Sequence, residues 1–215
     1  MGVLLGFDPG GKDGFGWCVA DDMPTLPLKV RATDVVDNAR SAVDGAMAWV
    51  EKGEQILAAG IDAPLFWVAT GDRNVDRIVR DDLWNLGARS PGGTVQAVNS
   101  LRGACVVQGM LTGVLLRAAL PEVLLTESHP KALLWQLRLA NRDRHPSGIS
   151  LLSLSQFSVP ASIGKTDHER DAAIGTLCAW AMLHKPQAWR NLYVEEQDAY
   201  SPITAPLGYW MPEVV

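Results

Sequence analysis

The chain has 215 residues, of which 47% are hydrophobic and 20% are charged, and its formal net charge is −5. This composition provides a sizeable apolar core and excludes an intrinsically disordered chain. Apolar runs stop well before the ~18 residues that a membrane-spanning helix requires, and the first residues lack the basic start of a signal peptide. The three cysteines form no Cys-x-x-Cys pair, so we expect free thiols, a reducing compartment and a cytoplasmic location.

Three short apolar segments at the start of the chain predict an antiparallel meander. They span 3–8 (VLLGFD), 14–20 (GFGWCVA) and 28–34 (LKVRATD). Connections rich in Gly or Pro separate these segments and have the length of hairpin turns. We therefore expect the three strands to pair in sequence order.

Helices and strands alternate after this meander. The hydrophobic pattern predicts strands over 56–62 and 122–127 and helices over 38–53, 97–119, 130–139 and 167–184. The capping box Thr166-x-x-Glu169 marks the start of the last helix. The order β-β-β-α-β-α-β-α predicts an α/β fold with a mixed five-stranded sheet flanked by helices, because strands joined through helices run parallel.

The remaining segments show less periodicity. We expect one domain over 1–215, with an insert at 66–96 that is rich in Arg, Asp, Gly and Pro. The stretch 186–215 contains four Pro and two Trp and predicts an irregular tail on the surface.

Acidic residues end three of the predicted strands. These residues are Asp8, Asp62 and Glu127. In open α/β sheets, ligands bind outside the carboxyl ends of parallel strands, so we expect these acids to converge. The last helix adds Asp167 and Asp171, which are four residues apart and share a helical face.

Such a group of carboxylates is typical of a site for divalent cations. Acids within about 5 Å repel one another unless a proton or a cation offsets their charge, and Mg²⁺ and Mn²⁺ prefer oxygen ligands. The predicted metal ligands are Asp8, Asp62, Asp171, Glu127 and Asp167. Divalent ions bound by carboxylates support phosphodiester cleavage. The residues that we expect to be catalytic in this reaction are Asp8, Asp62, Glu127, His168 and Asp171. Four of the predicted ligands also have a structural interpretation: turns at Asp8 and Asp62, a helix cap at Glu127, and the helix dipole at Asp167.

Four short motifs resemble a known family. The segment FDPGGKDGFGWCVA resembles the first hairpin of RNase H-like nucleases and resolvases, in which a strand-end Asp is a metal ligand. GIDAPL at 60–65, ESHPKALL at 127–134 and TDHERDAAIGTLCAW at 166–180 resemble a widespread uncharacterised family of predicted nucleases with an RNase H-like fold, distantly like Holliday-junction resolvases.

This resemblance covers roughly residues 3–183 and implies an RNase H-like fold. It places Asp8, Asp62 and Asp171 at the family's acidic positions and Glu127 at its strand-end Glu. The nuclease activity of that family is itself inferred from fold, and fold alone does not establish function. The acidic charge of this chain also departs from the basic surface expected of a protein that binds nucleic acid.

Basic residues in and near the insert are candidates for contact with substrate phosphates. Arg73, Arg77 and Arg80 follow one another at helical spacing, and Arg102 and Lys12 add charge outside the insert. The alternative for the three spaced arginines is a solvated helix face with ion pairs to neighbouring acids.

The function hypothesis is a divalent-metal-dependent phosphodiesterase that acts as a nuclease on a limited or structured nucleic acid. One alternative is a nucleotide-binding ATPase or kinase-like relative that holds phosphates with its Gly-rich hairpin, although this hairpin lacks P-loop spacing. Another is a non-catalytic RNase H-like module that binds a protein partner. The net charge counts against tight nonspecific nucleic-acid binding; we expect no membrane partner, and a homo-oligomer is compatible with the sequence.

Overall fold

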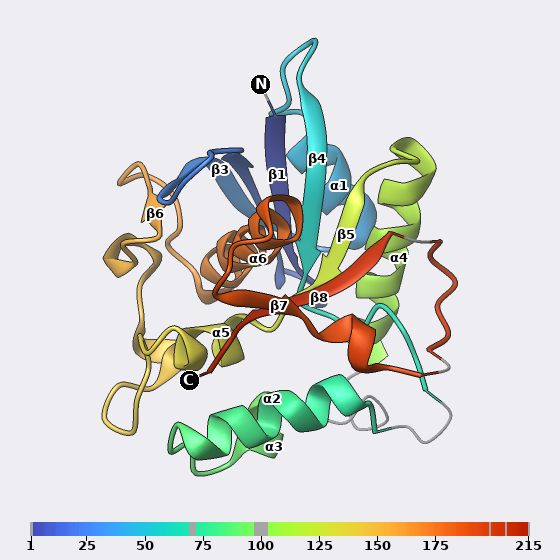
Figure 1. Cartoon of the computed structure of the whole chain (residues 1–215). Helices are drawn as coiled ribbons and strands as arrows, with labels where there is room; N and C mark the ends of the chain where they lie inside the picture. The colour runs from blue at the N-terminus through green and yellow to red at the C-terminus, as the bar shows by residue number, and fades with distance from the viewer. Residues whose placement is uncertain (1, 69–71, 97–102, 198, 205, 215) are drawn as a thin grey trace.

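The computed structural model describes residues 2–68, 72–96, 103–197, 199–204 and 206–214. An eight-stranded sheet crosses the molecule in the order β6-β3-β2-β1-β4-β5-β8-β7 (Figure 1). The strands are β1 (Gly2–Asp8), β2 (Phe15–Asp21), β3 (Leu28–Val36), β4 (Gln55–Ile61), β5 (Leu124–Glu127), β6 (Phe157–Ser158), β7 (Trp189–Asn191) and β8 (Leu207–Pro212).

The sheet combines two patterns of strand pairing. β1, β2 and β3 form the antiparallel meander that the sequence predicts. β4 pairs with β1 in parallel, β5 with β4, and β8 with β5. The mixed α/β class is therefore confirmed, whereas the sheet has three strands more than the five that were predicted.

Helices lie on both faces of this sheet, with α6 in front of the strands in Figure 1 and α1 behind them. The helices are α1 (Ala39–Met47), α2 (Asn74–Asn85), α3 (Pro91–Thr94), α4 (Gly103–Ala119), α5 (Pro130–Gln136) and α6 (Asp167–His184). Short 3-10 helices are η2 (Pro146–Gly148), η3 (Leu151–Ser153) and η4 (Leu192–Glu195). None of the described helices combines the length and apolarity needed to cross a bilayer.

Alternation along the strands divides the apolar core between the two faces. In β1, Leu4 belongs to the core cluster that contains α5 and α6, whereas Leu5 belongs to the cluster that contains α1. This is the expected consequence of side chains that point to opposite faces at successive positions.

The helix α6 is buried along most of its length, from Glu169 to Met182. The two central strands approach it closely because they carry Gly at the contact. A Cβ on Gly6 of β1 would overlap the carbonyl oxygen of Ala172, and a Cβ on Gly60 of β4 would overlap that of Gly175. The backbone of α6 therefore rests directly on the two central strands.

The tail differs from its prediction as an irregular segment. Its described residues include β7, η4 and β8, and every residue of β8 is buried. A strand buried on both faces lacks the alternation of polar and apolar residues by which a strand is recognised. The segment LGYWMP therefore gave no strand signal, although it pairs in parallel with β5.

The insert at 66–96 also has more structure than its composition suggested. Its described residues contain α2 and α3, and α2 buries Val75, Val79 and Leu83 at the spacing of one helical face. The predicted helix over 97–119 is seen as α4 from Gly103 onward, while 97–102 lie outside the described residues.

Candidate functional site

Three aspartates from different parts of the chain surround one region at the strand ends. Asp8 ends β1, and Asp62 directly follows β4. The two strands are parallel neighbours, and the backbone N–H of Asp62 donates to the carbonyl of Phe7 at 2.8 Å. Asp171 comes from α6, which rests on both strands. The structure thus brings together the three acids that the sequence predicted to converge.

Electrostatics shows that these carboxyl groups interact. Burial raises the pKa of Asp62 well above its usual value, and the charges of Asp8 and Asp171 raise it further. Burial, followed by the charge of Asp8, raises the pKa of Asp171 to about 6. Burial also raises the pKa of Asp8, against the opposing effect of a hydrogen bond to His168. The site therefore resists full ionisation unless a cation is added.

Basic side chains partner two of the three aspartates. His168 Nδ1 lies 2.7 Å from Asp8 Oδ2, and this hydrogen bond raises the pKa of His168. Arg170 contacts Asp171 through Nη2 at 2.7 Å, and Lys131 Nζ lies 4.0 Å from the other oxygen of Asp171. The structure therefore places His168 beside the acids, as predicted, and adds Lys131, whose position near the start of α5 went unnoticed in the sequence.

Asp167 takes a different position from the one predicted. Its side chain is 59% exposed and accepts from Arg170 Nη1 at 2.9 Å. Arg170 is itself buried and also donates to the carbonyl of Ile149. Asp167 thus pairs with Arg170 at the helix start, and no described contact joins it to Asp8 or Asp62.

A cavity of about 190 Å³ opens beside the aspartates. We call it the carboxylate cavity; residues around it include Asp8, Asp62, Thr94, Cys105, His129 and Lys131. His129 Nδ1 lies 3.5 Å from Asp62 Oδ1, and burial lowers the pKa of His129 to about 4. The imidazole is therefore neutral at physiological pH.

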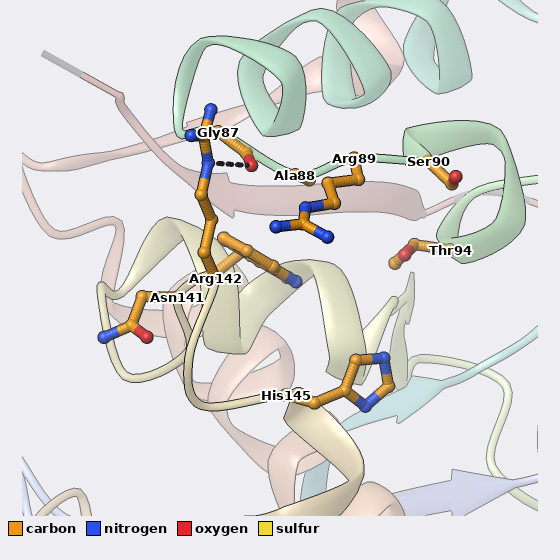
Figure 2. Close-up of a pocket in the computed structure, with 9 residues that line it drawn as sticks. Gly87, Ala88, Arg89, Ser90, Thr94, Asn141, Arg142 and His145 are labelled. Atoms are coloured by element: carbon orange, nitrogen blue, oxygen red, sulfur yellow. Dashed lines mark hydrogen bonds between the residues drawn. The ribbon is translucent and has the colours of Figure 1, made fainter.

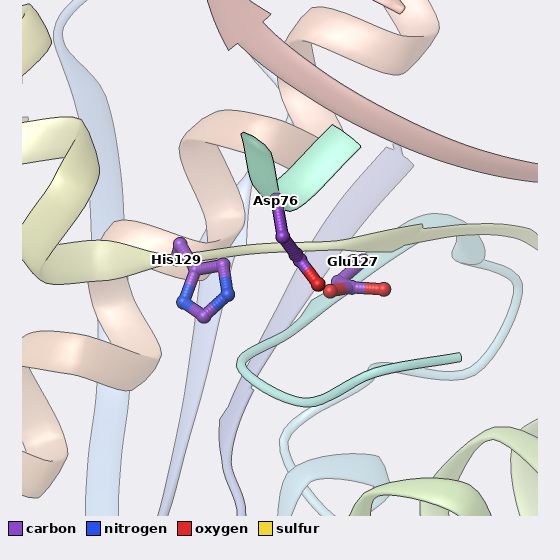
Figure 3. A group of neighbouring side chains, drawn as sticks. All are labelled: Asp76, Glu127 and His129. Atoms are coloured by element: carbon purple, nitrogen blue, oxygen red, sulfur yellow. The ribbon is translucent and has the colours of Figure 1, made fainter. Parts of the chain in front are cut away.

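Glu127 lies in a separate buried network. Its two oxygens accept from Arg73 Nη2 at 2.6 Å and from Nη1 at 2.8 Å. The same guanidinium donates to both oxygens of Asp76. Figure 3 shows the carboxylates of Asp76 and Glu127 close together, with His129 beside them. Arg73 supplies the positive charge that these two acids require, so Glu127 is engaged as an ion-pair partner and not as the fourth ligand that was predicted.

The spacing of possible ligand atoms separates these two groups of acids. Among the described residues, Asp76, Glu127 and His129 form the only group of three or more His, Cys, Asp or Glu whose ligand atoms lie within 4.8 Å of one another. Asp8, Asp62 and Asp171 are spread more widely. A single Mg²⁺ with bonds of about 2.0–2.1 Å would require side-chain rotation to contact all three, whereas two ions about 3.5–4 Å apart would span a wider site.

The predicted substrate-binding arginines do not form one exposed face. Arg73 is 1% exposed and lies in the ion-pair network. Arg77 donates to Asn74, and Arg80 donates to Asp72 at 2.7 Å. Lys12 is exposed in the turn between β1 and β2. Arg102 lies outside the described residues. The alternative given for the three spaced arginines, local ion pairing on a helix face, therefore describes Arg80. Arg73 instead turns inward.

Comparisons with protein-family models, with curated proteins and with solved structures found no match to this chain.

Proposed function

We propose that this protein is an RNase H-like phosphodiesterase that cleaves nucleic acid with the help of Mg²⁺ or Mn²⁺. The observation that carries the proposal is the meeting of Asp8, Asp62 and Asp171 in one largely buried, mutually repulsive group beside a cavity. An antiparallel meander extended by parallel strands, with acids after β1 and β4 and on a late helix, agrees with the fold that the four sequence motifs imply.

The donor chemistry of the three aspartates fits a hard divalent cation. All three supply carboxylate oxygens, and the raised pKa of Asp62 shows that added positive charge would be favourable there. Asp8, Asp62 and Asp171 would hold the ions. Bound ions of this kind would activate water and offset the charge that develops on the phosphate. Glu127 is left out of this set because Arg73 occupies both of its oxygens.

Protein side chains around the aspartates supply the other functions that phosphodiester cleavage requires. The ammonium group of Lys131 is half exposed at the cavity and attracts a phosphate toward the aspartates. Asp8 orients the imidazole of His168 through Nδ1, which leaves Nε2 available for proton transfer. His129 lies 3.5 Å from Asp62 and is neutral, so it adds no positive charge beside that carboxylate.

The decisive experiment compares cleavage by the wild type with that by Asp62→Asn and Asp8→Asn. The substrates are fluorescein-labelled single-stranded, duplex and branched oligonucleotides with Mn²⁺, and ATP serves as a test of the nucleotide hydrolase alternative. We expect both variants to lose at least about a hundredfold in rate, since even outer partners of metal ligands contribute 10–100-fold.

The matched control is Asp44→Asn, which removes an acid that is 63% exposed on α1, behind the sheet. This control should cleave at the wild-type rate. Equal cleavage by the wild type and Asp62→Asn would assign the activity to a contaminant and overturn the proposal. Hydrolysis of ATP without cleavage of any oligonucleotide would overturn it in favour of a nucleotide hydrolase.

A further inference from the structure

A second cavity lies next to the carboxylate cavity and has the opposite charge. It measures about 290 Å³ and is bordered by the segment after α2, by α3 and by the segment after α5 (Figure 2). The polar and aromatic side chains around it are Arg89, Ser90, Thr94, Trp135, Asn141, Arg142 and His145. We call this cavity the basic pocket.

The two arginines of the basic pocket have no acidic partner among the described residues. Arg89 makes no hydrogen bond or ion pair with any described residue, and Figure 2 shows its side chain extending into the pocket. Arg142 donates through Nε to the carbonyl of Gly87 at 3.1 Å, which orients its guanidinium. None of the described residues that line the pocket is Asp or Glu, although the chain as a whole carries a net charge of −5.

The neutral groups of the pocket also favour an anion. Ser90, Thr94 and the amide of Asn141 add donors around the arginines. His145 Nδ1 accepts from the backbone N–H of Ser147 at 3.3 Å, so the hydrogen of the neutral ring is on Nε2. Guanidinium groups with additional hydroxyl and ring donors match the oxygens of a phosphate.

The basic pocket adjoins the site of the proposed reaction. Thr94 borders both cavities, and Gly93 of the same short helix borders the carboxylate cavity. A chain of phosphates that entered one cavity would therefore pass close to the other at Thr94. Nucleic acid is such a chain, because it presents phosphates at regular intervals.

We propose that the basic pocket binds a backbone phosphate of a nucleic-acid strand whose reacting phosphate lies at Asp8, Asp62 and Asp171. The inference rests on the proposed function and adds the substrate class and a specific anchoring site. Arg89 supplies the principal positive charge, and Arg142 supplies a second guanidinium group with further N–H donors. One such anchor reconciles nucleic-acid binding with an acidic protein, because few phosphate contacts give modest affinity and restrict the substrates that bind.

The experiment measures binding of a fluorescein-labelled single-stranded oligonucleotide by anisotropy with Mn²⁺, in the Asp62→Asn background so that cleavage does not interfere. Arg89→Gln should weaken binding about tenfold, and the slope of log K against log salt should become shallower by about 0.7. Arg89→Lys keeps the charge and should retain most of the salt slope while losing part of the affinity. Since Arg89 is exposed and has no described partner, these variants are expected to fold.

The matched control is Arg40→Gln, an equal change of charge at an arginine that is 65% exposed on α1. It should change neither the affinity nor the slope. An Arg89→Gln protein with the affinity and salt slope of this control would overturn the inference. A further measurement uses inorganic phosphate and follows how much it raises the Tm. If Arg89→Gln abolishes this stabilisation by phosphate but leaves oligonucleotide binding intact, the pocket is a site for free phosphate and the inference is wrong.

The phosphodiesterase activity and the phosphate anchor can fail separately, and the two failures give different results. Absence of cleavage by the wild type, combined with oligonucleotide binding that depends on Arg89, would reject the phosphodiesterase and support the phosphate anchor. Cleavage by the wild type and by Arg89→Gln with the same KM, in contrast, would reject the anchor and support the phosphodiesterase.

Discussion

The guanidinium of Arg73 and the carboxylate of Glu127 form a buried two-point ion pair, with N–O distances of 2.6 and 2.8 Å. The two residues are 54 positions apart, so the pair joins the start of α2 to the end of β5. Arg73 also binds Asp76 and lies 4.5 Å from the centre of the Phe66 ring. This network supports the wall of the carboxylate cavity near His129, and it explains why an acid at a strand end is not a free ligand.

Removal of Arg73 should be strongly destabilising. Arg73→Ala leaves Glu127 and Asp76 buried without their cation, and the expected loss in the free energy of unfolding is about 3–5 kcal/mol. The control is Arg80→Ala, whose pair with the half-exposed Asp72 should contribute less than about 1 kcal/mol. Urea unfolding of both variants measures the difference. Similar losses at the two positions would contradict the assignment of Arg73 to a buried network.

Substitution of Glu127 should separate metal binding from stability. Glu127→Gln weakens the pair with Arg73 but removes none of the proposed metal ligands, so Mn²⁺ affinity at a temperature where the variant is folded should stay within about threefold of wild type. Asp62→Asn should lower this affinity at least about tenfold. Isothermal titration with Mn²⁺ makes the comparison. A loss in Glu127→Gln as large as that in Asp62→Asn would return Glu127 to the metal site.

Local pattern predicts most elements of this fold and three of its acids. The capping box at Thr166 and Glu169 identifies the start of α6, and both halves of the box are present in the structure. Asp8 and Asp62 follow apolar runs whose ends mark one edge of the sheet. These features depend on neighbouring residues, so the sequence alone is sufficient to find them.

Features that depend on distant partners were not predictable in this way. Helical spacing groups Arg73 with Arg77 and Arg80 but does not show which side of the helix is buried. Arg73 precedes the first residue of α2 and turns inward to Glu127. The basic pocket was missed for a similar reason, because Arg89 and Arg142 are 53 positions apart and meet only through the packing of α5 against the segment after α2.

The aspartate group should make stability depend on pH in the absence of metal. Asp62 and Asp171 have raised pKa values in the folded protein, about 6 for Asp171, so the folded state binds more protons than the unfolded state above about pH 4. Stability contributed by these groups is present at low pH and is lost as the pH rises through the folded pKa. Asp62→Asn should therefore be more stable than wild type at pH 8 with EDTA by at least about 1 kcal/mol, or roughly 2–4 °C in Tm.

This advantage should shrink toward pH 4, where the wild-type carboxyl group is protonated. Added Mn²⁺ should reverse the order at pH 8, since the metal stabilises the protein that binds it. Thermal unfolding at pH 4.5, 6 and 8, with EDTA and with Mn²⁺, tests both statements. A gain for Asp62→Asn that does not change with pH would show that repulsion among the aspartates is not its cause.

The close contact between β4 and α6 should be essential for both stability and activity. Gly60→Ala adds a Cβ that would overlap the carbonyl oxygen of Gly175, where two backbones meet and neither neighbour is a flexible side chain. Overpacking of this kind costs about 1–3 kcal/mol. Since α6 carries Asp171 and His168, its displacement should also lower cleavage by the folded protein. Gly148→Ala is the control, because its added Cβ has no atom within 4 Å and its φ is not positive. Urea unfolding and Mn²⁺-dependent cleavage should both show a loss in Gly60→Ala that is absent in Gly148→Ala. A Gly60→Ala protein with wild-type stability and rate would show that α6 does not need this contact to position Asp171.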